Sequence, residues 1–332
     1  MQIFDVGRHA PCVCVAALLL SACSAAQSQP PIGRNSIGSW MLPEAKSRKS
    51  ILMYAGGLYG NVYVYDYFTG KQFGELSDIG GDFGMCVDAR GDVYIGQSNK
   101  TTLEYAHGGT KVLNTYATDE ISDGCSVDAR NDVAITSESA SSPGVTVFAG
   151  GNPSKGKTYS NRDCKSTPPM GYDTGGDLIG LGDKKAPVYI CALLADSKTE
   201  QKLATSGFTI NAAGKTMWDG KYFALTDQDA KYDTDGIVQA SLSGKTVKSH
   251  GETILTDTCY NGYTAVTPFI VGDKNTPVND RQGKVLVGTN TWCSQSGDYV
   301  IEFWHYPSGG NPYKVYKIKA EIWGVGAISI GS

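Results

Sequence analysis

Apolar positions alternate with polar ones in short runs separated by turn residues, and one such unit recurs along the chain. Cys86–Ile95 reads CVDARGDVYI and Ser126–Ile135 reads SVDARNDVAI, and a weaker third copy, GYDTGGDLIG, spans Gly171–Gly180. Each copy predicts a strand, a tight turn and a second strand. The repeat distance of roughly forty residues is typical of the blades of a β-propeller.

An aspartate precedes the turn in each copy, and three positions later comes a residue that tolerates a positive φ. The aspartates are Asp88, Asp128 and Asp173, and the later residues are Gly91, Asn131 and Gly176. A short acceptor side chain before a turn can bond backbone N–H groups two residues further on. We therefore expect the aspartates to hold turns rather than to form a catalytic array.

A second unit recurs out of phase with the first, over residues 103–111, 147–155 and 304–314. In each case an outer strand leads into a Gly-Gly pair and then a lysine, such as Lys314, that opens the edge strand. Lysine on an outermost strand is a usual protection against unwanted edge pairing.

Strands of the kind that lies third in a blade can be counted along the chain. They begin near Val62, Thr102, Val145, Pro187, Ile237 and Val300. The count predicts an all-β fold, a six-bladed β-propeller. The first blade, residues 51–74, lacks an innermost strand, and residues 326–330 form a strand without a blade. We expect these to pair, so that strands from both termini close the ring.

Two other arrangements deserve comparison with the propeller. An eight-stranded sandwich explains neither the period nor the lone final strand. The sequence contains no convincing long amphipathic helix, and the best candidate, Leu193–Leu203, is short.

The N-terminal segment carries the features of an export signal. The apolar run Ala10–Leu20 is too short to span a bilayer. The small residues before Cys23 resemble the lipobox of bacterial lipoproteins, which implies that Cys23 is acylated and becomes the mature N-terminus. Ser24 then favours the outer over the inner membrane, and a secretory signal cut nearby is the alternative.

These features predict three parts of the chain. Residues 1–22 are a lipoprotein signal peptide, residues 23–49 are the lipidated cysteine and a flexible tether, and residues 50–332 are the propeller. The localisation expected is the bacterial envelope, reached by export and held by the lipid anchor.

Composition narrows the partners and the redox state. A net charge of −4 argues against nucleic acid, which requires a basic face. Six cysteines remain beyond Cys23, with up to three disulfides and fifteen pairings open, and none has zinc-knuckle spacing. Disulfides or buried thiols are therefore favoured for Cys86, Cys125, Cys164, Cys191, Cys259 and Cys293.

Three segments carry a resemblance to known proteins: Gly124–Asp128, Glu104–Gly109 and Trp218–Tyr222. Together with the leader, they look like those of bacterial lipoproteins similar to NHL-repeat and lactonase-like propellers. The likeness covers the chain from about residue 50 onward. It implies a fold without a catalytic residue set, since such propellers include calcium-dependent lactonases, lyases and pure binding modules.

Catalytic motifs are absent from the sequence. It has no Gly-x-Ser-x-Gly elbow, P-loop or dinucleotide fingerprint, and His107, His250 and His305 fall in turns or outer strands. The expected functional place is the mouth of the central channel, where carboxylates precede the innermost strands and could hold Ca²⁺. These residues are Asp82, Asp123, Asp163 and Asp257, with Trp323 beside them. Solvated loop acids are the simpler alternative and are favoured.

Two further groups have simple explanations. The acidic stretch 227–235 lacks the rest of a calcium-loop pattern and is expected to be a solvated loop. Trp218, Trp292 and Trp304 are expected to pack rather than to form a stacking surface.

The sequence thus favours a lipid-anchored binding module whose partner is an envelope protein, a polysaccharide or a small ligand. A calcium-dependent hydrolase or lyase of the lactonase-like type is the alternative, and a structural role in the envelope is the third.

Overall fold

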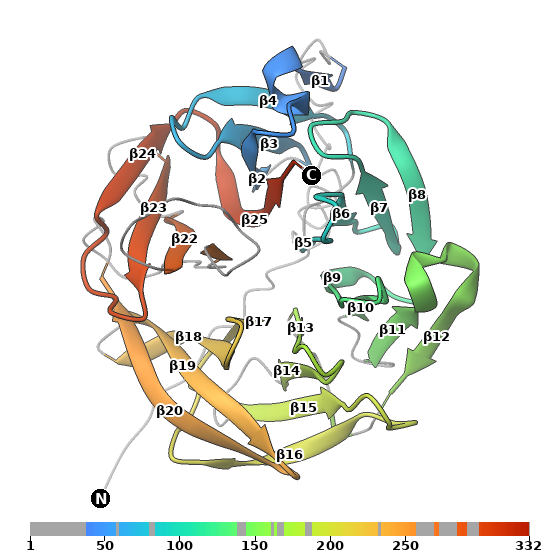
Figure 1. Ribbon diagram of the computed structural model, residues 1–332, viewed down its shortest axis with the longest axis vertical. Helices are drawn as coiled ribbons and strands as arrows, with labels where there is room; N and C mark the ends of the chain where they lie inside the picture. The colour runs from blue at the N-terminus through green and yellow to red at the C-terminus, as the bar shows by residue number, and fades with distance from the viewer. Residues whose placement is uncertain are drawn as a thin grey trace, which may run out of the picture. The chain divides into compact units, whose positions relative to one another are not determined.

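A computed structural model describes residues 38–331 of the chain, with gaps. The gaps are 58–59, 80–83, 138–143, 161–162, 165–168, 183–187, 232–233, 257–268, 272–283 and 291–298. Within the described part, the regular secondary structure is almost entirely β-strand (Figure 1). The helical elements there are three short 3-10 turns, η1 (Pro43–Lys46), η2 (Ala149–Gly151) and η3 (Pro153–Lys155).

The first sheet joins both ends of the described chain, in the strand order β1-β4-β3-β2-β25. Its strands are β1 (Trp40–Met41), β2 (Ile51–Gly57), β3 (Val62–Asp66), β4 (Gln72–Leu76) and β25 (Ile322–Ile330). Strand β25 runs antiparallel to β2, with Ile330 opposite Ile51 and Ile328 opposite Met53. The expected pairing of the last strand with the first is confirmed.

Three sheets are built from four consecutive antiparallel strands each. One holds β5 (Met85–Val87), β6 (Val93–Gly96), β7 (Thr101–Tyr105) and β8 (Val112–Ala117). The next holds β9 (Ser122–Val127), β10 (Val133–Ser137), β11 (Gly144–Phe148) and β12 (Gly156–Tyr159). The third holds β21 (Phe269–Val271), β22 (Lys284–Asn290), β23 (Tyr299–Tyr306) and β24 (Lys314–Ile318).

The remaining sheet has eight strands, which two sets of four form together. The first set is β13 (Gly171–Tyr172), β14 (Leu178–Gly182), β15 (Tyr189–Leu193) and β16 (Gln201–Ser206). The second is β17 (Ala213–Trp218), β18 (Phe223–Lys231), β19 (Thr234–Ser243) and β20 (Thr246–Leu255). The outermost strands β16 and β20 pair in parallel, with Ala204 opposite Thr246. This pairing of two edges was not predicted.

The strands expected in third place are found there, because β3, β7, β11, β15, β19 and β23 all lie third from the inner end of their sets. No convincing long amphipathic helix was expected, and the best candidate, Leu193–Leu203, is not a helix. Leu193 ends β15 and Leu203 lies in β16, with a turn between them. Of the six residues of β16 only Leu203 is buried, which fits a strand at the edge of a sheet.

The turn aspartates act as expected. Asp88 Oδ1 accepts the N–H groups of Arg90 and Asp92, each at 2.9 Å. Equivalent bonds to Oδ1 of Asp128 and Asp173 hold the other two copies. Gly91, Asn131 and Gly176 adopt the positive φ that the pattern required.

The innermost strands lie very close together, and two glycines show how close. A Cβ on Gly124 of β9 would come within 2.8 Å of Pro169 Cα. A Cβ on Gly171 of β13 would come within 2.8 Å of the Thr216 carbonyl oxygen in β17. The innermost strands β25, β5, β9, β13 and β17 contact one another in this succession, and β21 contacts β25 (Figure 1). The sheets are thus arranged around a common centre, and their neighbouring innermost strands pack closely against one another.

The main apolar cluster gathers around the first sheet and reaches Met85 in β5 and Met217 in β17. In the described part of the chain, no helix is long and apolar enough to cross a membrane.

Candidate functional site

The predicted channel-mouth site is only partly within the described residues. Asp82 and Asp257 lie outside them, as does the side chain of Trp323, although its backbone belongs to β25. Asp123 is half-buried in β9, and Asp163 is exposed. Among the described residues, no three His, Cys, Asp or Glu side chains gather in a way that would hold a metal ion. The calcium site stays a prediction, and so does the acylation of Cys23, which also lies outside.

The cysteines form two of the disulfides that the sequence left open. Cys86 bonds to Cys125, which ties β5 to β9 in the neighbouring sheet. Cys164 bonds to Cys191 of β15. Cys259 and Cys293 lie outside the described residues.

The interpretation of residues 227–235 as a solvated loop is wrong. Asp227 belongs to β18 and Asp235 to β19, and each is 1% exposed. Asp227 accepts backbone N–H groups from Asn211 and Ala212, at 3.0 and 2.9 Å. A carboxylate can be buried when backbone donors replace its water.

The expectation that tryptophans pack is confirmed for Trp304, which is fully buried and donates its indole N–H to the Thr256 carbonyl. Trp218 is half-buried and packs edge-on against Phe223. Trp292 lies outside the described residues.

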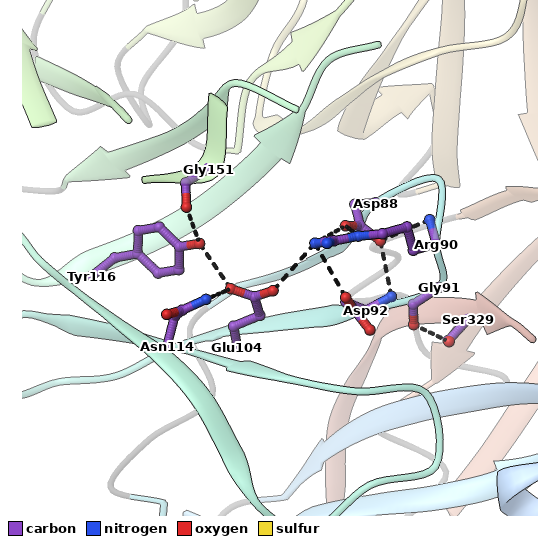
Figure 2. Close-up of polar contacts among 9 residues, drawn as sticks. All are labelled: Asp88, Arg90, Gly91, Asp92, Glu104, Asn114, Tyr116, Gly151 and Ser329. Carbon is purple, nitrogen blue, oxygen red and sulfur yellow. Dashed lines mark hydrogen bonds and ion pairs between the residues drawn. The ribbon is translucent and has the colours of Figure 1, made fainter. Parts of the chain in front are cut away.

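A polar cluster occupies the sheet β5–β8 and is drawn in Figure 2. Arg90, in the β5–β6 turn, pairs with Asp88 at 2.8 Å, with Asp92 at 3.2 Å and with Glu104 at 3.4 Å. Glu104 lies in β7 and is 2% exposed.

Two residues of β8 complete the surroundings of Glu104. Asn114 donates to Glu104 Oε2 at 2.8 Å, and the Tyr116 hydroxyl lies 2.8 Å from the same oxygen. That hydroxyl also lies 2.9 Å from the Gly151 carbonyl in the next sheet, and burial raises the pKa of Tyr116. Each carboxylate here has donors around it, so the cluster fixes strands rather than offering a reactive group.

Lys215 places an amine at the centre of the sheets. It lies in β17, and its Nζ donates to the carbonyls of Met85 in β5 and Gly326 in β25, at 3.2 and 3.4 Å. Burial lowers the pKa of Lys215 to about 7. The side chain therefore joins three innermost strands, and sequence reasoning missed it because no motif surrounds it.

His107 joins both terminal parts of the first sheet to the β7–β8 turn. Its Nε2 lies 2.8 Å from Ser50 Oγ, and its Nδ1 lies 2.6 Å from Ser329 Oγ. Ser329 donates its own proton to the Gly91 carbonyl at 2.5 Å. Ser50 Oγ likewise donates its proton elsewhere, to the Ser47 carbonyl at 2.6 Å, so each serine oxygen can accept a hydrogen bond from the ring nitrogen that faces it. Burial lowers the pKa of His107.

A groove of about 520 Å³ lies where the β13–β16 set meets the β17–β20 set, and it is partly open. Its lining residues belong to the β13–β14, β17–β18 and β19–β20 turns with the adjoining strand ends, and to the residue that follows β15. The residues that line it are Asp173, Asp177, Leu194, Trp218, Lys221, Phe223, Ser241, Leu242 and Gly244. It combines two carboxylates, an ammonium group and an indole, a mixture suited to recognition rather than to a defined reaction.

The β17–β18 turn that forms one wall is a further, shorter version of the aspartate turn. Asp219 Oδ1 accepts the N–H groups of Lys221 and Tyr222, each at 2.8 Å, and Gly220 has a φ of 91°. The sequence signal was the Asp-Gly pair inside Trp218–Tyr222, which sequence reasoning used only for its resemblance.

Comparison with known proteins identifies the fold. No family model matches the chain, and no curated protein matches it in sequence. The resemblance to NHL-repeat and lactonase-like propellers therefore has no support from sequence comparison.

Solved structures do match, at low identity. A chain of the nidogen/laminin complex has a TM-score of 0.59 at 12% identity, covering 85% of this chain and 99% of that one. TolB from Acinetobacter baumannii has a TM-score of 0.56 at 12% identity, over 85% of this chain and 66% of that one. A protein of unknown function from Bacteroides caccae has a TM-score of 0.56 at 12% identity, over 84% of this chain and 98% of that one. The chain is all-β and propeller-like.

Proposed function

We propose that this chain is a binding module of the bacterial envelope: a six-bladed propeller, anchored through a lipid on Cys23, that holds a partner on the face where the aspartate turns lie. The observation that carries this proposal is the groove between the β13–β16 and β17–β20 sets. A propeller-like fold is consistent with an interaction role, and the nidogen/laminin complex is an example of such a fold found in a protein complex.

The division into six blades is supported by the strand sets. Five sets of four consecutive strands follow the first sheet, if the eight-stranded sheet is divided at its parallel pair. That division is natural, because the β16–β20 pair joins outermost strands, whereas each set is continuous and antiparallel.

The groove is tested by photo-crosslinking in living cells of the native host. A photoreactive amino acid at Ser241, in the groove, should capture a partner. The matched control is Asn99, which is exposed in the β6–β7 turn at the opposite end of the strands. Adducts from Ser241 and none from Asn99 support the proposal. No adduct from Ser241, or equal adducts from both positions, would contradict it.

The anchor is tested separately. Cys23→Ser should abolish incorporation of labelled fatty acid and release the chain from the membrane fraction, because the proposed acyl chains provide the membrane affinity. Continued labelling of the Cys23→Ser variant would show that the anchor assignment is wrong.

A further inference from the structure

The repeated aspartate turns differ at the position two residues after the first aspartate, where two of the three copies carry a positive charge. In the first two copies an arginine stands two positions after the aspartate. Arg90 pairs with Asp88 and Asp92, at 2.8 and 3.2 Å. In the second copy, the same paired arrangement joins Arg130 to Asp128 at 2.9 Å and to Asp132 at 3.6 Å. One guanidinium thus serves two carboxylates in each turn.

The third copy keeps both carboxylates and lacks the arginine. Gly175 stands where Arg90 and Arg130 stand in the other copies. Asp173 Oδ1 still accepts the N–H groups of Gly175 and Asp177, at 2.8 and 2.9 Å. Asp177 Oδ1 accepts the N–H of Ala195 at 2.9 Å. Within the described part of the chain, neither carboxylate has an ion-pair partner, and both line the groove.

The second copy shows where the missing guanidinium would lie. Arg130 Nη2 is 2.9 Å from the position that a Cβ on Gly176 would take, so this guanidinium sits between its own turn and the turn of the next set. The same placement one repeat later falls between the Asp173–Asp177 turn and the β17–β18 turn. That is the position of the groove.

The rest of the groove suits a planar cation. The indole of Trp218 forms part of the wall, and guanidinium groups stack on indole rings. Lys221, the one lysine among the lining residues, holds its Nζ over the Tyr222 ring at 4.7 Å from the ring centre rather than against the carboxylates.

We propose that the groove binds an arginine side chain of a partner protein, whose guanidinium takes the place that Arg90 and Arg130 fill in the two earlier turns. This inference rests on the proposed binding function and names its partner chemistry. The guanidinium would pair with Asp173 and Asp177 and pack on Trp218.

The test uses the full chain and a small probe, N-acetyl-arginine amide, with N-acetyl-citrulline amide as its uncharged isostere. The indole N–H signals of the protein are followed by NMR during titration. The arginine probe should shift one indole signal saturably, the signal that Trp218→Phe removes, and the citrulline probe should not. Equal shifts with both probes, or none with arginine, would overturn the proposal.

Substitutions at Gly175 give a sharper comparison. Gly175→Arg supplies the guanidinium from within the chain and should weaken probe binding at least tenfold. Gly175→Ala adds a Cβ without charge, and the atoms nearest to that Cβ belong to the Asp173 carboxyl group, with Oδ1 at 3.2 Å. It should therefore weaken binding by much less than Gly175→Arg does. Asp173→Asn with Asp177→Asn keeps the turn acceptors and removes both charges, so it should also weaken binding at least tenfold. Undiminished binding in Gly175→Arg would overturn the proposal.

The melting temperature, measured without any ligand, tests whether the Gly175→Arg variant folds with its arginine in the turn. Gly175→Arg should melt at a higher temperature than Gly175→Ala, and added salt should reduce the difference, because the new pair is electrostatic. A lower melting temperature for Gly175→Arg would show that the turn does not accept an arginine.

The two proposals fail in different ways. If Ser241 captures a partner in cells equally well in wild type and in Gly175→Arg, the groove binds a partner but not through a guanidinium. If Ser241 captures nothing while the arginine probe binds, the proposal that this groove holds a protein partner is contradicted, and the proposal of a guanidinium site is retained.

Discussion

The buried amine of Lys215 links three innermost strands, although burying its charge lowers the stability of the fold. Its Nζ donates to carbonyls of two other innermost strands, and burial lowers its pKa to about 7. Desolvation disfavours the charged form of a lysine, and dipoles of carbonyl groups compensate only in part. The side chain therefore joins three sheets, but its charged form destabilises the fold relative to the unfolded chain.

Stability should consequently rise with pH above neutrality. An unfolded lysine keeps its proton to about pH 10.4, whereas folded Lys215 releases it near pH 7. Between these values the unfolded state binds more protons, so the free energy of unfolding increases by up to about 1.4 kcal/mol per pH unit. Below the folded pKa both states are protonated, and this contribution stays constant. Urea denaturation at about pH 7 and about pH 9 should show a gain that Lys215→Met removes. The same gain in both proteins would contradict this assignment.

His107 should make the free energy of unfolding depend on pH on the acid side of neutrality. Burial lowers its pKa from the ordinary value of 6.5, so the folded state holds it neutral while the unfolded state takes up a proton. The free energy of unfolding should therefore fall as the pH falls through 6.5 and below.

We expect His107→Asn to flatten this acid limb. At neutral pH the substitution should cost about 1 kcal/mol, because Ser50 loses its hydrogen bond to Nε2. Thermal melts of both proteins across about pH 5 to 7.5 would measure the change. An unaltered acid limb would mean that another group controls it.

The residue scale also shows how far sequence reasoning reaches. The turn roles of Asp88, Asp128 and Asp173 were predictable because donor and acceptor lie within four residues. The Ser50–His107–Ser329 contacts were not, since 57 and 222 residues separate the partners. The groove had a sequence signal, Gly175 at the position of Arg90 and Arg130, which becomes meaningful only when the turn geometry is known.

At the scale of elements, the local pattern of apolar and turn residues predicted which strands form. It did not predict the pairing of the two edge strands β16 and β20. The third-place strands were found from the Gly-Gly turns and apolar runs. The parallel pair of β16 and β20 depends on how two outermost strands happen to approach, and no residue pattern in either strand specifies a partner. The prediction of a solvated loop at Asp227 and Asp235 was wrong for a related reason. The charges of these residues favoured a loop, but the pairing of β18 with β19 places both residues in strands, where they are buried.

The close approach of innermost strands yields a prediction about glycine. Gly124→Ala should destabilise the fold by about 1 to 3 kcal/mol, because the added methyl group would overlap Pro169 in a packed centre. Gly38→Ala is the matched control, since a Cβ at Gly38 meets nothing within 4 Å. Chemical denaturation of both variants provides the measurement. A neutral Gly124→Ala would show that the neighbouring strand moves aside easily.

At the scale of the whole molecule, closure depends on one strand. Strand β25 pairs with β2 along its length and supplies the Gly326 carbonyl to Lys215 and the Ser329 hydroxyl to His107. This closure was predictable because an incomplete first sheet and a lone last strand complement each other. The disulfide Cys86–Cys125 was open among fifteen pairings and needed the structure.

A chain that lacks residues 322–332 should lose cooperative unfolding, because β2 and the buried side chains of the first sheet would face water. A synthetic peptide of residues 322–330, added in excess, should restore the cooperative transition by supplying the missing strand. Circular dichroism during heating would report both results. A truncated chain that melts as the intact one does would contradict the central role of β25.

The order of strands in the first sheet also determines when this sheet can be completed during synthesis of the chain. Strand β25 follows every other described strand in the chain, yet it is the neighbour that β2 requires. While the ribosome is still synthesising the preceding sheets, β25 does not yet exist, and β2 therefore lacks the strand that pairs with it.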